Sequence, residues 1–247
     1  MLLTSFYIAF ILYLILLFLC IFGLRRGELT IGLVAFLVNG VTLALAYFNS
    51  GQLPVFNLFE SFLIASFILA GLALFSLWFG DHFPRTRLWV WMEVLVLFII
   101  LLLVPKQLSN SAYDHDYLFI ILFHLFRVIA LALMLYSSAC FIELRVQRRI
   151  ERGENARTLS QRCRNFLVLS AVFFLSGEYV GIVWSQNGWG DFWHWNSGFF
   201  QSTLIVLYLM IALHIPGKGG KAEGVRSLIG GLSGFFMMTM MILRSFY

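Results

Sequence analysis

The feature that most constrains this chain is a series of eight apolar runs that recur along its whole length. A transmembrane helix needs about 20 residues to cross a hydrocarbon core of roughly 30 Å, because each residue adds about 1.5 Å. The sequence therefore predicts an all-α integral membrane protein, a bundle of eight transmembrane helices. The runs lie near residues 4–24, 31–48, 59–80, 88–105, 117–144, 165–185, 197–215 and 226–245.

Composition supports this fold class and leaves little room for any other. Hydrophobic residues make up 61% of the chain and charged residues 12%, which is too few charges for the surface of an ordinary soluble globule. The connections between the runs are short except for residues 145–164. We therefore expect a single transmembrane domain over residues 1–247. The sequence shows no nucleophile and base pair, HExxH motif or phosphate-binding loop, so we do not expect an enzyme.

Basic residues indicate the orientation of the bundle. Of the 17 Lys and Arg residues, most fall on alternate connections, beginning with Arg25 and Arg26 and including the basic loop at 145–164. Such connections face the cytoplasm in membrane proteins, which predicts that both termini lie outside. The net charge of +5 is then a mark of topology, and we expect no nucleic-acid partner. A second interpretation of the 145–164 loop is attraction to anionic membrane lipids.

Five ionisable residues lie within the predicted spans, where such groups are costly and often functional. Structural pairing inside the bundle is the alternative explanation for each of them. All but Glu93 fall in the outer half of the predicted membrane, and His124 and Arg127 share a helix face at spacing i, i+3. The five are Glu60, Glu93, His124, Arg127 and Glu178.

Tryptophan is crowded into one short stretch between the sixth and seventh runs. Four of the seven tryptophans lie within residues 184–195, together with His194. Interfacial aromatic belts enrich tryptophan in any membrane protein, but they do not explain this local crowding. Glycines 188 and 190 allow the stretch to turn tightly. A neutral imidazole, several aromatic faces and a nearby cation such as Arg127 are the groups that would hold haem, by its iron, its ring and its propionates.

Two motifs of this chain resemble signatures of a known family. Residues 189–196 read WGDFWHWN and resemble the WGxxWxWD signature of the cytochrome c assembly family, the haem-handling proteins of the CcsA and CcmC type. Residues 54–61 read PVFNLFES and are similar to the P-x-x-N-L-x-E-S stretch before the third span in the CcsA branch. The similarity covers most of the chain, and its eight runs resemble the CcsA branch more than the shorter CcmC subtype.

The resemblance implies a protein that binds or translocates non-covalent, b-type haem and presents it at the outer face of the bacterial cytoplasmic membrane for cytochrome c maturation. It implies His124 as the outer iron ligand and His214 as an inner-leaflet ligand. A ResB-like membrane partner and apocytochrome c are the implied partners, with which the chain would form part of a haem-attachment complex. Further residues expected to contact haem are Glu60, Arg127, Trp189, Gly190, Trp193, His194, Trp195 and Asn196.

The chain departs from the family pattern at two places. Asn196 stands where the family has Asp, which removes a negative charge but keeps a hydrogen-bonding group. No histidine follows His214, so the second outer iron ligand of the family is missing. His194 and His115 are candidate substitutes from neighbouring outer loops.

Two other functions stay open from the sequence. One is a HemX-like relative that keeps the fold and regulates haem synthesis or assembly. The other is a small-molecule transporter that uses the same buried polar groups, although the sequence shows no inverted repeat or broken helix of the kind typical of transporters.

Overall fold

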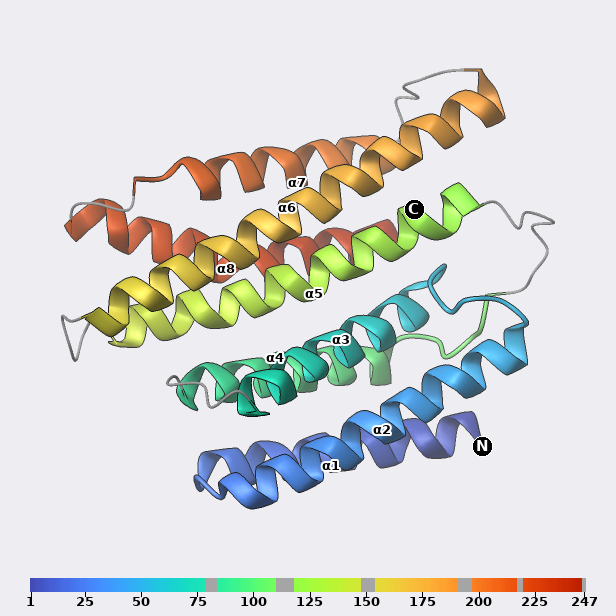
Figure 1. Cartoon of the computed structure of the whole chain (residues 1–247). Coiled ribbons are helices and arrows are strands. Elements are labelled where there is room, and N and C mark those ends of the chain that lie inside the picture. The colour runs from blue at the N-terminus through green and yellow to red at the C-terminus, as the bar shows by residue number, and fades with distance from the viewer. Residues whose placement is uncertain (79–83, 110–117, 148–153, 191–196, 217–219, 246–247) are drawn as a thin grey trace. The chain divides into compact units, whose positions relative to one another are not determined.

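The computed structural model describes residues 1–78, 84–109, 118–147, 154–190, 197–216 and 220–245 (Figure 1). All regular structure in these ranges is α-helix, which confirms the predicted all-α class. The helices are α1 (Leu2–Ile21), α2 (Arg25–Ser50), α3 (Leu58–Trp78), α4 (Pro84–Leu103), α5 (Leu118–Gln147), α6 (Glu154–Trp189), α7 (Ser197–His214) and α8 (Gly220–Arg244).

Length and composition make these helices compatible with a multi-pass membrane bundle. Seven of the described helices are long and apolar enough to cross a membrane. The remaining one, α7, is a shorter apolar helix over Gly198–His214. The count of eight spans therefore stays a prediction.

The connection predicted at residues 145–164 is wrong in its extent. Helix α5 continues to Gln147 and α6 already begins at Glu154, so residues 154–164 are helical. Leu159 and Cys163 lie one turn apart in this part of α6, and both are fully buried. This apolar stripe extends the packing of α6 on α5 beyond the hydrophobic run itself. The sequence prediction missed it because the arginines around the stripe lower the mean hydropathy.

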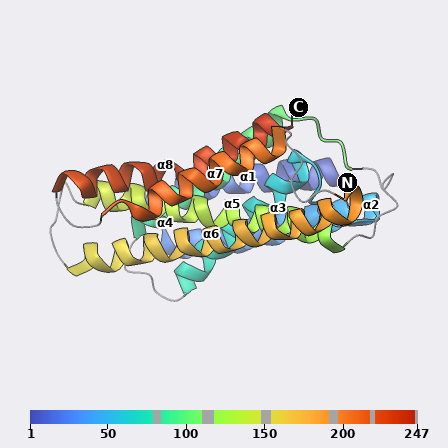
Figure 2. The same cartoon turned by 90° about the horizontal axis from the view of Figure 1, so that it is seen from above.

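The chain divides into two compact units, residues 1–115 and 116–247, which we describe separately. In the first unit α1 packs on α2, α2 on α3, α3 on α4, and α4 returns to α1. In the second unit the helices close in the same cyclic order, from α5 through α6, α7 and α8 back to α5. Each unit is thus a four-helix bundle whose sequence neighbours lie side by side (Figures 1 and 2).

Helix α1 of the first unit is apolar on both its buried and its exposed face. Its buried residues are Phe6, Ala9, Tyr13 and Leu16, which lie on one face at spacings of three and four. Phe6 stacks on Phe98 of α4, with ring centroids 5.5 Å apart. The opposite face of α1 carries large exposed apolar side chains, as expected for a helix that faces lipid.

Helix α2 presents a seam of small and polar residues to the first unit. Its buried positions follow spacings of three and four along the helix. Asn39 on this seam is fully buried and donates to Ser66 of α3 at 3.1 Å. Small residues that permit close approach, with interhelical hydrogen bonds, are the usual means of holding helices together in lipid. The seam residues are Glu28, Gly32, Ala35, Asn39, Thr42 and Ala46.

The second unit depends on close contact between α5 and α8. A Cβ added at Gly234 would lie 2.7 Å from the Cα of Leu135, so the two backbones approach closely only because position 234 lacks a side chain. Ser138 of α5 accepts a hydrogen bond from the Gly234 amide at 2.8 Å. These contacts fix α8 along α5 and thereby bring the C-terminal end of α8 to the start of α5.

Candidate functional site

The second unit contains a cavity of about 190 Å³ at the end where α5 and α7 begin and α6 and α8 end. We refer to this end as the cavity end. All four helices of the unit contribute side chains or glycines to its wall. The lining residues are Phe123, Arg127, Glu178, Gly181, Trp184, Ser185, Gly198, Phe199, Ser202 and Arg244.

Arg127 of α5 is the buried cation of the cavity. The residue is 5% exposed, and its guanidinium lies 4.9 Å from the ring centroid of Phe123. Its Nη2 donates to Ser202 Oγ at 3.1 Å, whereas its Nη1 has no hydrogen-bond acceptor among the described residues. A buried guanidinium N–H group without an acceptor is costly, so this cavity favours a ligand that brings an acceptor such as a carboxylate.

Glu178 of α6 compensates Arg127 only in part. Its Oε1 lies 3.5 Å from Arg127 Nε, which is an ion pair without a hydrogen bond by geometry. Arg244, near the end of α8, also lines the cavity and is exposed, so it lies at the cavity edge. Among the described residues, the charged lining residues are two arginines and one glutamate, which together carry one net positive charge.

Aromatic side chains and glycines shape the rest of the wall. Trp184 of α6 and Phe199 of α7 supply flat apolar surface beside the arginines. A Cβ added at Gly181 would lie 2.8 Å from the Phe123 ring, so this glycine lets α6 approach α5 at the cavity. The wall therefore combines cationic and aromatic surfaces, which suits an anionic aromatic ligand.

His124 lies beside the cavity without lining it. It follows Phe123 in α5, and the two rings meet edge to face with centroids 5.2 Å apart. The side chain is half-buried. The sequence predicts that His124 and Arg127 share one face of α5; both lie at the cavity end of the second unit, but only Arg127 lines the cavity.

His214 lies at the opposite end of the second unit. It is the last residue of α7, sixteen residues beyond Gly198 at the cavity, which corresponds to about 24 Å along the helix. Its Nδ1 contacts the Met210 carbonyl oxygen at 2.7 Å. When Nδ1 carries the proton and donates it, Nε2 keeps the lone pair that binds metals. His124 and His214 belong to two separate places and cannot ligate one iron together.

Most of the tryptophan motif lies outside the described residues, namely Trp193, His194, Trp195 and Asn196, as does His115. The structure describes the backbone of Trp189 as the last residue of α6 but not its side chain. Gly190 has φ +74°, in the left-handed region that glycine adopts without strain, and it ends α6 at the cavity end. The roles expected for these residues stay predictions.

Glu60 belongs to the first unit, where the structure gives it a capping role. Asn57 Oδ1 accepts from the Glu60 amide at 2.8 Å, and Glu60 Oε2 accepts from the Asn57 amide at 3.4 Å. This reciprocal pair is a capping box at the start of α3. Glu60 Oε2 also accepts from the Phe56 amide, and Oε1 from the amide and hydroxyl of Ser109. The fully buried carboxylate is therefore held by hydrogen bonds from two loop segments.

The PVFNLFES stretch at 54–61 thus has a structural explanation in this chain. Val55 is fully buried, and its carbonyl accepts from the Ser61 hydroxyl at 2.9 Å. The Asn57 side-chain amide donates to the Gln107 carbonyl at 2.7 Å. Together with the capping box, these bonds join the loop before α3 to the segment after α4. The haem contact expected of Glu60 stays a prediction.

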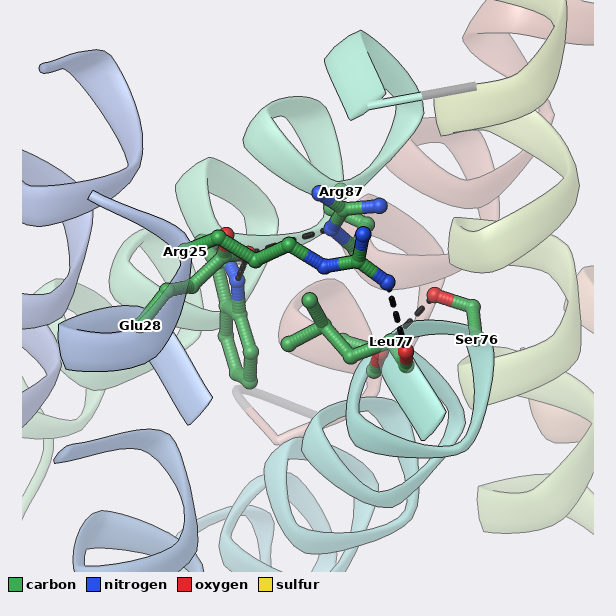
Figure 3. Close-up of polar contacts among 7 residues, drawn as sticks. Arg25, Glu28, Ser76, Leu77 and Arg87 are labelled. Carbon is green, nitrogen blue, oxygen red and sulfur yellow. Dashed lines mark hydrogen bonds and ion pairs between the residues drawn. The ribbon is translucent and has the colours of Figure 1, made fainter. Parts of the chain in front are cut away.

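Sequence reasoning missed two features of the structure. It treated Arg244 only as a charge at the C-terminal end, although this residue lines the same cavity as Arg127 and Glu178. It also missed a buried ion pair in the first unit, where Arg87 Nε lies 3.2 Å from Glu28 Oε1 (Figure 3). Trp91 donates to the same oxygen at 3.0 Å. The pair escaped the sequence analysis because Glu28 lies in a segment that was predicted to be a loop and its partner Arg87 belongs to another helix.

Arg25 adds a second polar link near this ion pair. Its guanidinium donates to the Leu77 carbonyl of α3 at 3.4 Å, as Figure 3 shows. The arginines near the starts of α2 and α4 therefore connect helices. Glu93, another candidate from the sequence, is buried in α4 of the same unit.

Comparison of the sequence with known proteins identifies no family for this chain. No protein-family model matches the chain, and no curated protein matches it either.

Proposed function

We propose that the chain binds haem at the cavity end of its second unit and presents it at the outer face of the membrane for cytochrome c maturation. One observation carries the proposal: Arg127, buried in a cavity with aromatic walls, has a guanidinium nitrogen without an acceptor among the described residues. Haem is a flat aromatic molecule with carboxylate substituents, so its ring suits the aromatic walls and a carboxylate supplies the acceptor that Arg127 lacks.

The available groups fit this ligand in several respects. Arg127, with Arg244 at the edge, would bind a carboxylate of the ligand, and Trp184 and Phe199 would contact its apolar surface. His124 would supply a neutral imidazole for the iron on the same end of α5. The cavity end also leads into the WGDFWHWN stretch, whose tryptophans would extend the aromatic surface.

His214 would serve a different stage of the same task. It lies at the far end of α7 with its Nδ1 held by a carbonyl oxygen, which orients Nε2 as a ligand. A haem that enters from the cytoplasmic side would meet His214 first and the cavity end later. The proposal includes the eight spans that the apolar runs predict, both termini outside, as the distribution of Lys and Arg predicts, and the bacterial cytoplasmic membrane that the family resemblance implies.

A partner completes the proposal. Within the described residues the chain consists of helices and short connections, so it offers no separate domain to receive an apocytochrome. A ResB-like membrane protein would supply that domain. The chain itself would hold and orient haem rather than form the covalent bond.

The test is a haemin titration of the purified protein followed in the Soret region. Wild-type protein should give a saturable spectrum of ligated haem, and His124→Ala should change the axial-ligand signature and weaken binding. Arg85→Gln is the matched control, because Arg85 is exposed and lies in the first unit. A colourless protein that takes up no added haemin contradicts the proposal.

Regulation of haem synthesis is a second candidate, favoured by the absence of any histidine after His214 in the sequence. A relative that regulates haem synthesis would keep the fold and some haem affinity without the full ligand set of the delivery proteins. Deletion in the native host separates the two. Loss of c-type cytochromes supports delivery, whereas altered haem synthesis with normal c-type cytochromes supports regulation.

A further inference from the structure

The cavity is too small to enclose a whole haem-sized ligand. Sites that surround drug-sized molecules have volumes of roughly 300–1,000 Å³, whereas this cavity measures about 190 Å³. A ligand of that class would therefore insert one substituent and leave its main body outside. The polar wall identifies which kind of substituent fits.

The charges of the wall fit one carboxylate and not two. In the described part of the wall Arg127 and Arg244 oppose one glutamate, Glu178, so one monoanion brings these charged groups to neutrality. Arg127 Nη1 offers an N–H donor for that anion at the buried end, whereas the Ser202 hydroxyl already donates to the Gly198 carbonyl. A second carboxylate in the same space would lie close to Glu178 without a further cation among the lining residues, and like charges at short range repel strongly in a poorly solvated site.

We infer that the cavity selects one carboxylate arm of its ligand, held by Arg127, and leaves any second carboxylate outside. The inference rests on the proposed function, since it concerns how the same site recognises haem. Glu178 then has a specific part: it sets the charge of the cavity so that a single arm is accepted. Arg244, at the exposed edge, supplies the positive charge that Glu178 leaves unbalanced and that the single carboxylate matches.

A series of haemin esters tests this directly on the wild-type protein. Haemin, its monomethyl ester and its dimethyl ester carry two, one and no free carboxylates. We expect the monomethyl ester to bind within about threefold of haemin and the dimethyl ester to bind about 10- to 100-fold more weakly, which is the effect of one charge-assisted hydrogen-bonded contact. The series needs no variant, so a folding defect cannot obscure it.

Variants distinguish recognition by the cavity from an effect of the greater lipophilicity of the esters. In Arg127→Gln the three compounds should bind with similar affinity, whereas Arg85→Gln should keep the wild-type ranking. Glu178→Gln, which raises the net charge of the cavity, should increase the advantage of haemin over its monomethyl ester.

The outcomes distinguish this inference from the proposed function. If the dimethyl ester binds as tightly as haemin, or if both esters are equally weak, the one-arm inference is overturned while haem binding stands. If none of the three compounds binds, haem binding itself fails and the inference falls with it.

Discussion

Glu60 accepts a hydrogen bond from the backbone amide of Ser109 at 2.8 Å, forty-nine residues away along the chain. The same carboxylate caps α3 through Asn57. A buried glutamate that the sequence suggested as a haem contact therefore joins the loop before α3 to the segment after α4. Its cost of burial is offset by four backbone or hydroxyl donors rather than by a cation.

Replacing Glu60 by alanine should destabilise the first unit. The change removes the cap and leaves the amides of Phe56 and Ser109 without their acceptor, so we expect a loss of about 2–4 kcal/mol in the free energy of unfolding. Thermal unfolding in detergent measures it. Glu60→Gln, which keeps an acceptor oxygen, should lose less. A normal melting temperature with greatly weakened haemin binding would instead support a direct haem contact.

The close packing of α8 on α5 should not tolerate a side chain at position 234. Gly234→Ala would place a methyl group 2.7 Å from Leu135 Cα, and overpacking of this kind costs about 1–3 kcal/mol. Gly224→Ala is the matched control in the same helix, since its Cβ would meet nothing within 4 Å. The control should gain up to about 1 kcal/mol from helix propensity. Equal melting temperatures for the two variants would contradict the close approach.

The buried pair of Glu28 and Arg87 should show strong coupling. Glu28→Gln and Arg87→Gln each leave one buried charge without its partner, which costs about 3–5 kcal/mol. The double variant should lose clearly less than the sum of the two, and a double-mutant cycle on unfolding free energies measures the difference. Additive losses would mean that the pair contributes no interaction of its own.

Orientation can be tested by labelling single cysteines from outside intact cells, in a background with Cys20, Cys140 and Cys163 replaced. The exposed Gln186 lies in the last turn of α6, next to the tryptophan motif, and the exposed Arg26 lies at the start of α2. We expect a membrane-impermeant maleimide to modify Gln186→Cys and to spare Arg26→Cys. The reverse pattern would place the tryptophan motif in the cytosol and remove the proposed presentation at the outer face.

The sequence predicted the helices well because apolar runs of membrane length leave few alternatives. It placed the starts of α2 and α6 several residues late, since Arg25, Glu28 and the arginines after 154 read as a polar loop. Those residues are helical because Glu28 pairs with Arg87 and because Leu159 and Cys163 pack inward. Polar contacts between distant helices cannot be read from the periodicity of one segment.

The candidate site was predicted in part for the same reason. Depth along the predicted spans correctly grouped Arg127 with Glu178, which the structure brings to 3.5 Å. Depth alone could not tell that Glu60 would find donors in two loops, because that depends on how those loops pair. It also gave no weight to Arg244, whose place beside Phe123 follows from the packing of α8 on α5.

The central claim is that haem iron binds at the cavity end of the second unit. The most direct measurement is an iron anomalous-scattering map from crystals of the haemin-loaded protein. We predict a peak within coordination distance of His124, with a carboxylate of the ligand at Arg127. A peak only beside His214, or no peak at the cavity end at full haemin loading, would contradict the account.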